Sequence, residues 1–540
     1  MKHEISQELV LLEEKEQELL KQFLDARAAT ATKRAEFDRH IQTVSTPTTN
    51  LINSKLPTEL LLSILYYSAF TTSIPYHRRQ RKEKLASVCR RWRDIIHRNP
   101  RFWTTIHVPS NISSMEAHLK RSCGIPLDIV ISIHKKASEK HFVSSLDKAV
   151  SQAHRWHTLE VDDFTRDKEN GRSLLPDLIS EKTDFPSLRR VIIKNRHSTY
   201  DITHLNFLSP AHSPALEHLE LDKFVGTPDF LPLTLNTLKL SPNNGWPFKN
   251  QHTRYCLSLP NLIVTQALMT LSLSGQADVS RFEPNSIPFP SLNTLEMINV
   301  TGVRQFMDAI VAPNLERFTY ISTNHDGDPP STVFDGFGSK FTSVHHLLLS
   351  DSATSHDRSL DRRDAWVLCE AFPHVRHVEL KGGSLPLLFG PSRCKKPGSD
   401  GPPARPISTW TELESFTING LNDQWLDPAH LPAWLVNRRI VLGLQRLHVT
   451  LKGSTSSGSY YGGLDDHIGI RNFAELFECL KENCVLDLDN FHLIQLGVFL
   501  SMSRNSPLRV VSPYNWLQPW ILFSPHLGLE MPRTKDEAYG

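Results

Sequence analysis

The feature that most constrains the fold is a short pattern that recurs along most of the chain. In most copies an aromatic residue or a proline precedes a strand-like L-x-x-L-x-L stretch. Such self-similarity is typical of a solenoid, in which each unit buries its apolar face against its neighbours. The copies are RWHTLEV at 155, FPSLRRVII at 185, SPALEHLEL at 213, TLNTLKL at 234, FPSLNTLEMINV at 289, APNLERFTY at 312, FTSVHHLLL at 341, FPHVRHVEL at 372, WTELESFTI at 410 and LGLQRLHVTL at 442.

The pattern resembles leucine-rich repeats in a degenerate form. Its anchors are unevenly spaced, since Leu216 and Leu235 are half as far apart in sequence as Val375 and Leu413. We therefore expect an α N-terminal region followed by an irregular α/β leucine-rich-repeat-like solenoid over residues 109–510, with residues 511–540 as a C-terminal cap or tail. A generic α/β domain with several parallel strands is the alternative. The anchors are Leu188, Leu216, Leu235, Leu292, Leu315, Val344, Val375, Leu413 and Leu444.

A second pattern lies before the repeats. The stretch LPTELLLSIL begins at Leu56, and Pro57 occupies a first helical turn, where its missing N–H is tolerated. The stretch KLASVCRRWRDIIHRNPRFW begins at Lys84 and places apolar residues at helical spacing until Pro100 stops the helix. Both stretches predict short amphipathic helices, and a simple helical hairpin with its own core is the plainest interpretation.

Together the two stretches follow an LP…E(L/I)L…I…VCRxWR…W pattern, which resembles the F-box. The resemblance implies that residues 51–108 dock onto a Skp-family adaptor and join a cullin-based, SCF-type ubiquitin ligase. The segment from Tyr66 to Lys84 departs from the family because it is longer and more basic. The adaptor contacts implied by the resemblance are Leu56, Pro57, Leu60, Leu61, Ile64, Leu65, Val88, Cys89, Trp92, Arg93, Ile96 and Trp103.

The order of segments extends the resemblance. An N-terminal coil, the F-box, a Pro126-Leu127-Asp128 strand, an Arg155-Trp156 strand and irregular leucine repeats resemble the large F-box families of basidiomycete fungi. The first segment, residues 1–45, has apolar residues at steps of three and four, which predicts an amphipathic helix. That helix either pairs as a coiled coil or packs on the F-box.

Composition excludes several classes of protein. The chain has 540 residues, 39% hydrophobic and 22% charged, which indicates folded domains rather than global disorder. A formal net charge of +2 argues against a nucleic-acid binder. The longest apolar runs fall short of the roughly 18 residues that a membrane span needs. The seven scattered cysteines are typical of reduced thiols in the cytoplasm or nucleus.

Motifs for catalysis are lacking in the sequence. Cys479 and Cys484 have no second Cys/His pair for zinc, and the adjacent His345 and His346 point to opposite faces of a strand. GSTSSG at 453 lacks the spacing of a nucleophile elbow, and GFGSK at 336 is no phosphate loop. We therefore expect no enzyme active site, no metal and no cofactor.

A cluster of basic residues between Arg78 and Arg101 has three interpretations. It is a solvated face of the F-box, a nuclear-import signal at HRRQRKEK, or a nucleic-acid patch. Few aromatic residues are interleaved for base stacking, which disfavours the last.

The sequence thus predicts a substrate-receptor subunit without chemistry of its own. The alternative is a protein-interaction scaffold whose F-box-like hairpin acts outside a ligase. The client protein is unknown. Candidate contacts are exposed positions of the strands and loops, such as Arg189, Arg190, Glu217, His218, Arg317, His345 and Arg376.

Overall fold

The structure is a computed structural model of the chain. It describes residues 15, 17–18, 21–37, 39, 56–70, 75–133, 139–163, 183–195, 200–201, 205–225, 231–242, 266–275, 282–300, 302–322, 330–338, 340–351, 362–381, 388–390, 405–419, 430–441, 443–452 and 476–489.

Helices come first along the described chain. Residues 21–37 are helical, within the amphipathic helix expected over residues 1–45. The segment that carries the F-box-like pattern then forms three α-helices and a short 3-10 turn that leads into the first strand. These are α2 (Thr58–Phe70), α3 (Pro75–Val88), α4 (Arg90–Arg98) and η1 (Pro100–Trp103).

One large parallel sheet of 15 strands forms most of the remaining structure. Its strands are β1 (Thr105–Val108), β2 (Leu127–Ile133), β3 (Trp156–Asp163), β4 (Arg190–Asn195), β5 (Tyr200–Asp201), β6 (His218–Val225), β7 (Thr237–Pro242), β8 (Thr270–Ser274), β10 (Thr294–Ile298), β12 (Arg317–Ser322), β13 (His346–Asp351), β14 (His377–Lys381), β15 (Ser415–Asn419), β16 (Leu447–Lys452) and β17 (Cys484–Asp489). Strands β9 (Ile287–Pro288) and β11 (Ile310–Val311) pair separately.

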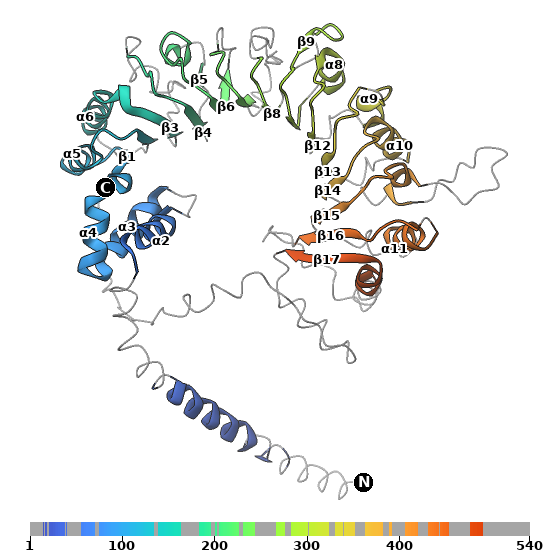
Figure 1. The fold of residues 1–540 in the computed structure, drawn as a ribbon, viewed down its shortest axis with the longest axis horizontal. Helices are drawn as coiled ribbons and strands as arrows, with labels where there is room; N and C mark the ends of the chain where they lie inside the picture. The colour runs from blue at the N-terminus through green and yellow to red at the C-terminus, as the bar shows by residue number, and fades with distance from the viewer. Residues whose placement is uncertain are drawn as a thin grey trace, which may run out of the picture.

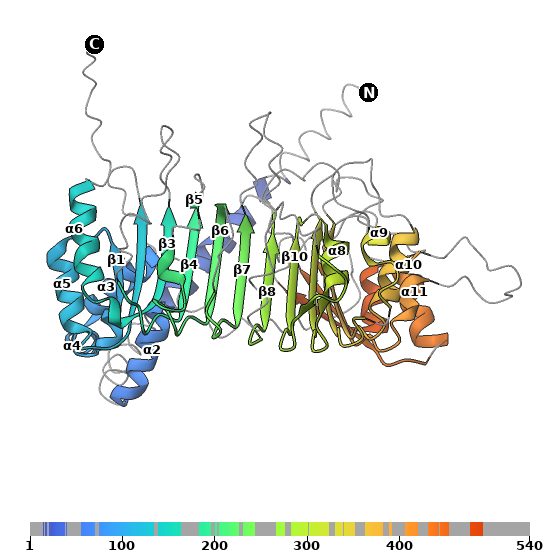
Figure 2. The same ribbon diagram turned by 90° about the horizontal axis from the view of Figure 1, so that it is seen from above.

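The strands follow one another in chain order from β1 to β17, and only β5 lies off this path, against β6. The sheet curves into an arc whose strands line the inside, while helices cover the outside (Figure 1). Seen from above, the strands stand side by side and the helices gather at both ends (Figure 2). The outer helices are α5 (Ile112–Arg121), α6 (Glu139–Val150), α8 (Val303–Ala309), α9 (Pro330–Phe334), α10 (Arg362–Ala371) and α11 (Leu431–Val436).

Alternation along each strand explains the two faces of the sheet. In β10, Leu295 and Met297 are buried while Thr294, Glu296 and Ile298 are partly exposed. Successive side chains of a strand point to opposite faces, so one face packs under the helices and the other lines the inside of the arc. The predicted anchors from Leu188 to Leu413 are buried, whereas Leu444 is only half-buried. One hydrophobic core runs from Ile106 to Cys484 beneath the helices.

The expected fold class, an α N-terminal region followed by an irregular leucine-rich-repeat-like solenoid, is wrong. The described chain is built instead on one continuous parallel sheet with equivalent residues in register from strand to strand. The uneven spacing of the anchors suggested an irregular solenoid. In the structure the strands pair regularly, and the connections between them differ in their number of residues. Parallel strands need crossover connections, and a surface connection tolerates extra residues at little free-energy cost.

Six of the strands were not predicted from the sequence, namely β1, β5, β8, β9, β11 and β17. Strand β8 and the last strand, β17, lack the aromatic residue or proline that marks most of the other units at their start. The expected C-terminal cap or tail at 511–540 lies outside the described residues. Within the described chain, no helix combines the length and apolar character needed to cross a bilayer.

Candidate protein-interaction surface

Helix α2 has two apolar sides, and only one of them faces the protein interior. The helix begins at Thr58, one residue after the proline that was predicted to lie in its first turn, and the backbone N–H of Leu61 donates to the carbonyl of Pro57 at 3.1 Å. Leu61, Leu65 and Ala69 are buried at a spacing of four residues, which places them on one face. This face belongs to a separate small core, whose other buried members are Ile96, Phe102 and Trp103.

A second side of α2, about 100° around the helix from the buried one, carries apolar side chains in solvent. Leu60 is 54% exposed, Ile64 49% and Tyr67 74%, and Pro57 is exposed as well. Steps of three, four and three residues align these four side chains along the helix. We call Pro57, Leu60, Ile64 and Tyr67 the α2 stripe. Leaving such side chains in water forgoes the favourable free energy of burial, so a row of them marks a surface that another protein can cover.

Helix α4 is fixed to α2 through the arginine-rich pattern. Cys89 caps α4, because its Sγ accepts a hydrogen bond from the backbone N–H of Trp92 at 3.4 Å. Arg91 donates to the carbonyl of Leu56 at 2.8 Å and so ties the start of α2 to α4. Arg93 donates to the carbonyl of Ala86 at 3.1 Å, at the end of α3. Arg91 and Arg93, the second of which is among the implied adaptor contacts, therefore hold the helices together.

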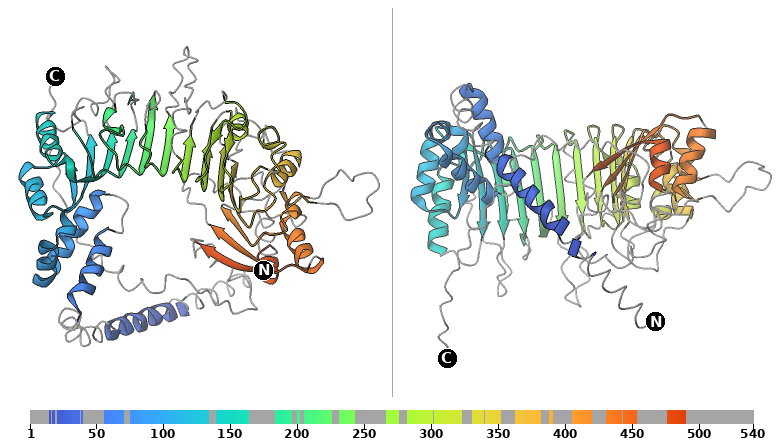
Figure 3. Two further views of the ribbon diagram at one scale, coloured as in Figure 1. Left: turned by 45° about the horizontal axis from the view of Figure 1, so that its top comes forward. Right: turned by 90° about the horizontal axis from the view of Figure 1, so that it is seen from below.

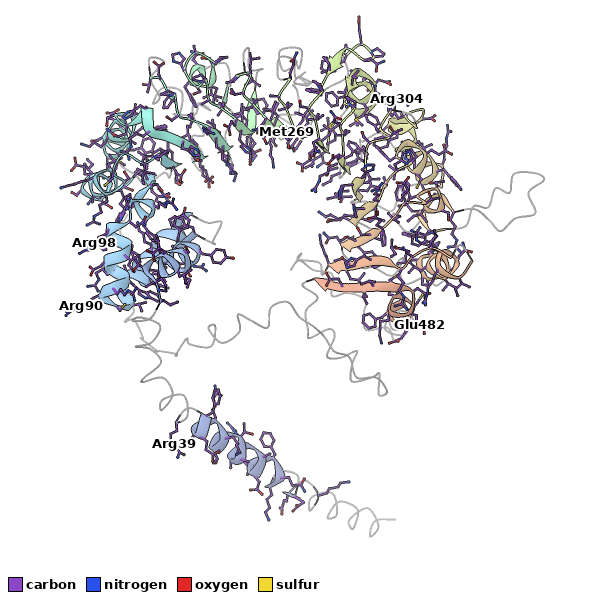
Figure 4. The ribbon with its side chains drawn as sticks, viewed as in Figure 1. Arg39, Arg90, Arg98, Met269, Arg304 and Glu482 are labelled. Carbon is purple, nitrogen blue, oxygen red and sulfur yellow. The ribbon has the colours of Figure 1, made fainter. Side chains whose placement is uncertain are left out.

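The side chains of Arg90 and Arg98, by contrast, point outward from α4 (Figure 4). They supply positive charge beside the helical bundle without a role in its core.

The twelve residues predicted to contact an adaptor fall into three groups. Pro57, Leu60, Ile64, Val88 and Arg93 are exposed, and Val88 is 58% exposed at the end of α3. The half-buried group is Leu56, Cys89 and Trp92. The buried group, which supports the helices from within, is Leu61, Leu65, Ile96 and Trp103.

Tyr67 was missed from the sequence, although its spacing of three from Ile64 could have identified it. Tyr67 also borders a shallow groove of about 450 Å³ on α2. The groove is lined by Leu62, Ser63, Tyr66, Tyr67, Phe70 and Arg101. Aromatic rings continue inward from it, since the ring of Tyr66 lies 5.9 Å from that of buried Phe102, centroid to centroid. The α2 stripe thus continues into a concave aromatic surface, as protein interfaces often do.

One lysine of the basic cluster is structural. Lys82 is only 9% exposed, and its Nζ donates to the carbonyl of Phe102 at 3.2 Å. The same ammonium group lies 4.2 Å from the centroid of the Trp103 ring, a cation–π geometry. Arg121 of α5 lies over that ring too, at 4.3 Å. Lys82 therefore belongs to none of the three interpretations of the cluster, because its charge is used inside the fold.

The predicted client contacts lie in or directly before the strands of the sheet, and three of them share one register on the inside of the arc. Arg190, His218 and Arg317 share one register across β4 to β12. The others precede the strands by one residue and continue the ladder, as Glu217 does when its N–H donates to the carbonyl of Arg189 at 2.9 Å. His345 and Arg376 are paired in the same way.

The described residues contain no group of three or more His, Cys, Asp or Glu side chains placed to hold a metal ion. No protein-family model matches this chain, and no curated protein matches it.

Proposed function

We propose that the protein is a substrate-receptor subunit of an SCF-type ubiquitin ligase, with the α2 stripe as its docking surface for a Skp-family adaptor. The observation that carries the proposal is the division of α2 into a buried face, Leu61 and Leu65, and an exposed apolar face, Leu60 and Ile64. A helix in a monomeric domain normally buries one apolar stripe and exposes polar residues elsewhere. The second apolar face therefore favours a partner, and the F-box-like pattern indicates which kind.

The inside of the arc suits the second task of a receptor, which is to hold a client protein. Its strands offer partly exposed polar side chains over a long, continuous surface, and its two ends curve toward each other (Figure 3). In this proposal the chain performs no reaction. It raises the effective concentration of the client near a ubiquitin-loaded enzyme.

The proposed place of action is the cytoplasm or nucleus. Five cysteines of the described chain are free thiols, which is typical of reducing compartments.

The alternative, a scaffold that acts outside a ligase, is favoured by one observation. Helix α3 (Pro75–Val88) is a strongly basic helix of 14 residues between the two halves of the F-box-like pattern. Its presence there departs from the family pattern. The two candidates differ in whether a cullin is recruited along with the adaptor.

The test is a pull-down of the full-length chain with a purified Skp-family adaptor and cullin. The variant Leu60→Ser/Ile64→Ser should lose at least about 90% of adaptor capture, because two buried apolar contacts at about 1.5–3 kcal/mol each would be removed. The matched control is Ile440→Ser, which changes another exposed apolar residue, 72% exposed, at the far end of the arc. That variant should bind as the original does.

Each result separates the candidates. Capture of adaptor and cullin together supports the receptor. Capture of adaptor without cullin, under conditions where the adaptor binds cullin, favours the scaffold. A folded original chain that captures no adaptor refutes both roles for the α2 stripe.

A further inference from the structure

One register of the sheet carries hydrogen-bond donors and no carboxylate over eleven strands. Its members occupy equivalent positions on the inside of the arc, as the Cα pairing of neighbouring strands defines them. We call this the donor row. It consists of Thr158, Arg190, His218, Thr237, Thr270, Thr294, Arg317, His346, His377, Ser415 and His448.

The donor row concentrates nitrogen donors at β12, β13 and β14. Arg317, His346 and His377 are consecutive in the row, so their Cα atoms are spaced by about 4.8 Å, the distance between strands. The rings of His346 and His377 stack with centroids 4.3 Å apart and an angle of 23° between their planes. Three side chains that can carry positive charge thus lie side by side on three strands.

Two of these side chains remain open to a partner. His377 is already engaged, since its Nδ1 lies 2.7 Å from the Ser415 hydroxyl. Arg317 is exposed, and although its backbone N–H donates to the carbonyl of Asn293, its side chain has no hydrogen bond or ion pair within the described part of the chain. His346 is half-buried beside it, in contact with the His377 ring. An exposed guanidinium beside a partly desolvated imidazole is a common arrangement for binding an anionic oxygen.

Carboxylates flank this cluster, which limits what can bind. Glu316 precedes Arg317 on β12, and Glu414 Oε2 lies 4.0 Å from His377 Nε2. Two residues beyond His377 along its strand, Glu379 pairs with Lys452 at 3.2 Å and with Lys381 at 3.5 Å. The positive charge of Arg317 therefore has carboxylates near it, and the next lysines along the sheet, Lys381 and Lys452, are paired with Glu379. A nucleic-acid backbone repeats its charge every few ångströms and would meet these acids, whereas one isolated anionic group would not.

The number of fixed charges selects among small anions. Arg317 is always protonated, and its planar fork matches the two oxygens of one carboxylate. His346 is held mainly in its neutral form near pH 7, because burial lowers its pKa and the nearby charges of His377, Arg317 and His345 lower it further, against an opposing effect of Glu316. The two negative charges of a phosphate dianion would thus meet only one full positive charge, with acids nearby. The single negative charge of a carboxylate is balanced by the one charge of Arg317.

We propose that Arg317 and His346 form a binding site for a carboxylate side chain on an extended, otherwise uncharged segment of a partner protein. Arg317 donates two parallel N–H hydrogen bonds to the carboxylate oxygens, and His346 donates a further hydrogen bond once protonated. The identification of that partner as a ligase client rests on the proposed function. Binding at the site does not.

The test is fluorescence anisotropy of labelled peptides with the full-length chain, in the absence of adaptor. Three peptides share one polar, uncharged framework and differ only at the central residue, which is glutamate, glutamine or phosphoserine. The glutamate peptide should bind about tenfold more tightly than the glutamine peptide, the change that about 1.4 kcal/mol from charge-assisted hydrogen bonds gives. Its affinity should fall as the pH rises from 6 to 8, because binding favours protonated His346.

Two variants make the test specific. Arg317→Gln should remove the preference for glutamate over glutamine. Arg190→Gln is the matched control, because Arg190 is an exposed arginine of the same donor row on β4. It should leave the preference unchanged.

Several results would overturn the proposal. Equal binding of the glutamate and glutamine peptides would refute the carboxylate site, and tighter binding of the phosphoserine peptide would refute the choice of anion. An equal loss of the preference for glutamate in Arg190→Gln would show that the preference comes from long-range electrostatic attraction and not from a site at Arg317. Preferential binding of a single-stranded oligonucleotide would refute the choice of a protein partner. Because peptide binding and adaptor capture are measured separately, either proposal can fail while the other stands.

Discussion

The indole N–H of Trp103 donates a hydrogen bond to the carbonyl of Ile96 at 3.0 Å, seven residues earlier in the chain. The same bond recurs in the sheet domain, where the indole of Trp156 donates to the carbonyl of Ala149 at 3.1 Å, also seven residues earlier. Each tryptophan lies between a helix and a strand: Trp103 is the last residue of the 3-10 turn η1, just before β1, and Trp156 is the first residue of β3, directly after the 3-10 turn η2 (Ala153–Arg155). Helix α4 of the F-box-like segment is therefore joined to β1 as α6 is joined to β3.

This joint leads to a prediction for Trp103. Trp103→Phe keeps a ring between Lys82 and Arg121 but leaves the buried Ile96 carbonyl without its donor, so it should destabilise the protein by about 1–3 kcal/mol. Trp103→Ala should destabilise it by about 3–5 kcal/mol, because a large cavity is added. Calorimetric Tm values, compared with the original chain, measure both changes. Similar Tm values for Phe and Ala variants would contradict a role for the packed ring.

The two faces of α2 predict that neighbouring substitutions change the stability of the chain by very different amounts. Leu61→Ala and Leu65→Ala should each lower the free energy of unfolding by about 2–5 kcal/mol, because both side chains are buried in the small core. Leu60→Ala and Ile64→Ala should change it by less than about 0.5 kcal/mol in the isolated chain, since both are exposed. Denaturation followed by circular dichroism provides the comparison. A large loss in Leu60→Ala would mean that another part of the chain covers the α2 stripe.

Glu379 predicts a pH-dependent contribution to stability. Burial by itself would raise the pKa of Glu379, but hydrogen bonds from Lys452 and Asn419 and the charges of Lys452 and Lys381 lower it overall. A carboxylate with a lowered pKa stabilises the fold above its unfolded pKa, about 4.3, and that contribution disappears as the pH falls through the folded value. Lys452→Gln should therefore lower stability at pH 7 by about 0.5 kcal/mol, since the pair is partly exposed.

The measurement for Glu379 is the Tm difference between original and variant from pH 7 down to pH 3. The difference should shrink as the pH falls below about 4, when the carboxylate becomes protonated. Lys481→Gln is the control, because Lys481 pairs only with exposed Glu478 one helical turn away. A Tm difference that stays constant from pH 7 to pH 3 would show that the effect of Lys452 does not depend on the ionised carboxylate of Glu379.

The cysteines predict selective alkylation. Burial raises the pKa of Cys369 well above its usual range, and burial, followed by the nearby Cys479, raises the pKa of Cys484 to about 12. Cys123 is exposed. Iodoacetamide reacts with the thiolate, so at pH 8 Cys123 should be modified at least about a hundredfold faster than Cys369 or Cys484. Peptide mapping by mass spectrometry gives the rates, and unfolding in denaturant should make them similar. Fast labelling of Cys369 in the folded chain would contradict its burial.

Much of the local structure could be predicted from the sequence. Strands β7, β10 and β14 lie within the predicted L-x-x-L-x-L copies. They could be predicted because the alternation of apolar residues along a strand is visible in a short stretch of sequence. The helical stretches around Leu56 and Trp92 were predicted from apolar residues at helical spacing, which is also visible in a short stretch of sequence. Continuity of the sheet was not, since the pairing of strands far apart in sequence leaves no mark in the spacing of their anchors.

For the candidate sites, the sequence by itself determined which residues are apolar, cationic or helix-forming. It could not decide between Leu60 and Leu61, because α2 has apolar residues on both sides and its spacing alone does not say which side meets α4. Only the tertiary structure made Leu61 a core residue and left Leu60 in solvent. Likewise the strand register brought Arg317, His346 and His377 together from three separate units. Such neighbours are set by pairing and packing over long sequence distances, and those are properties of the whole fold.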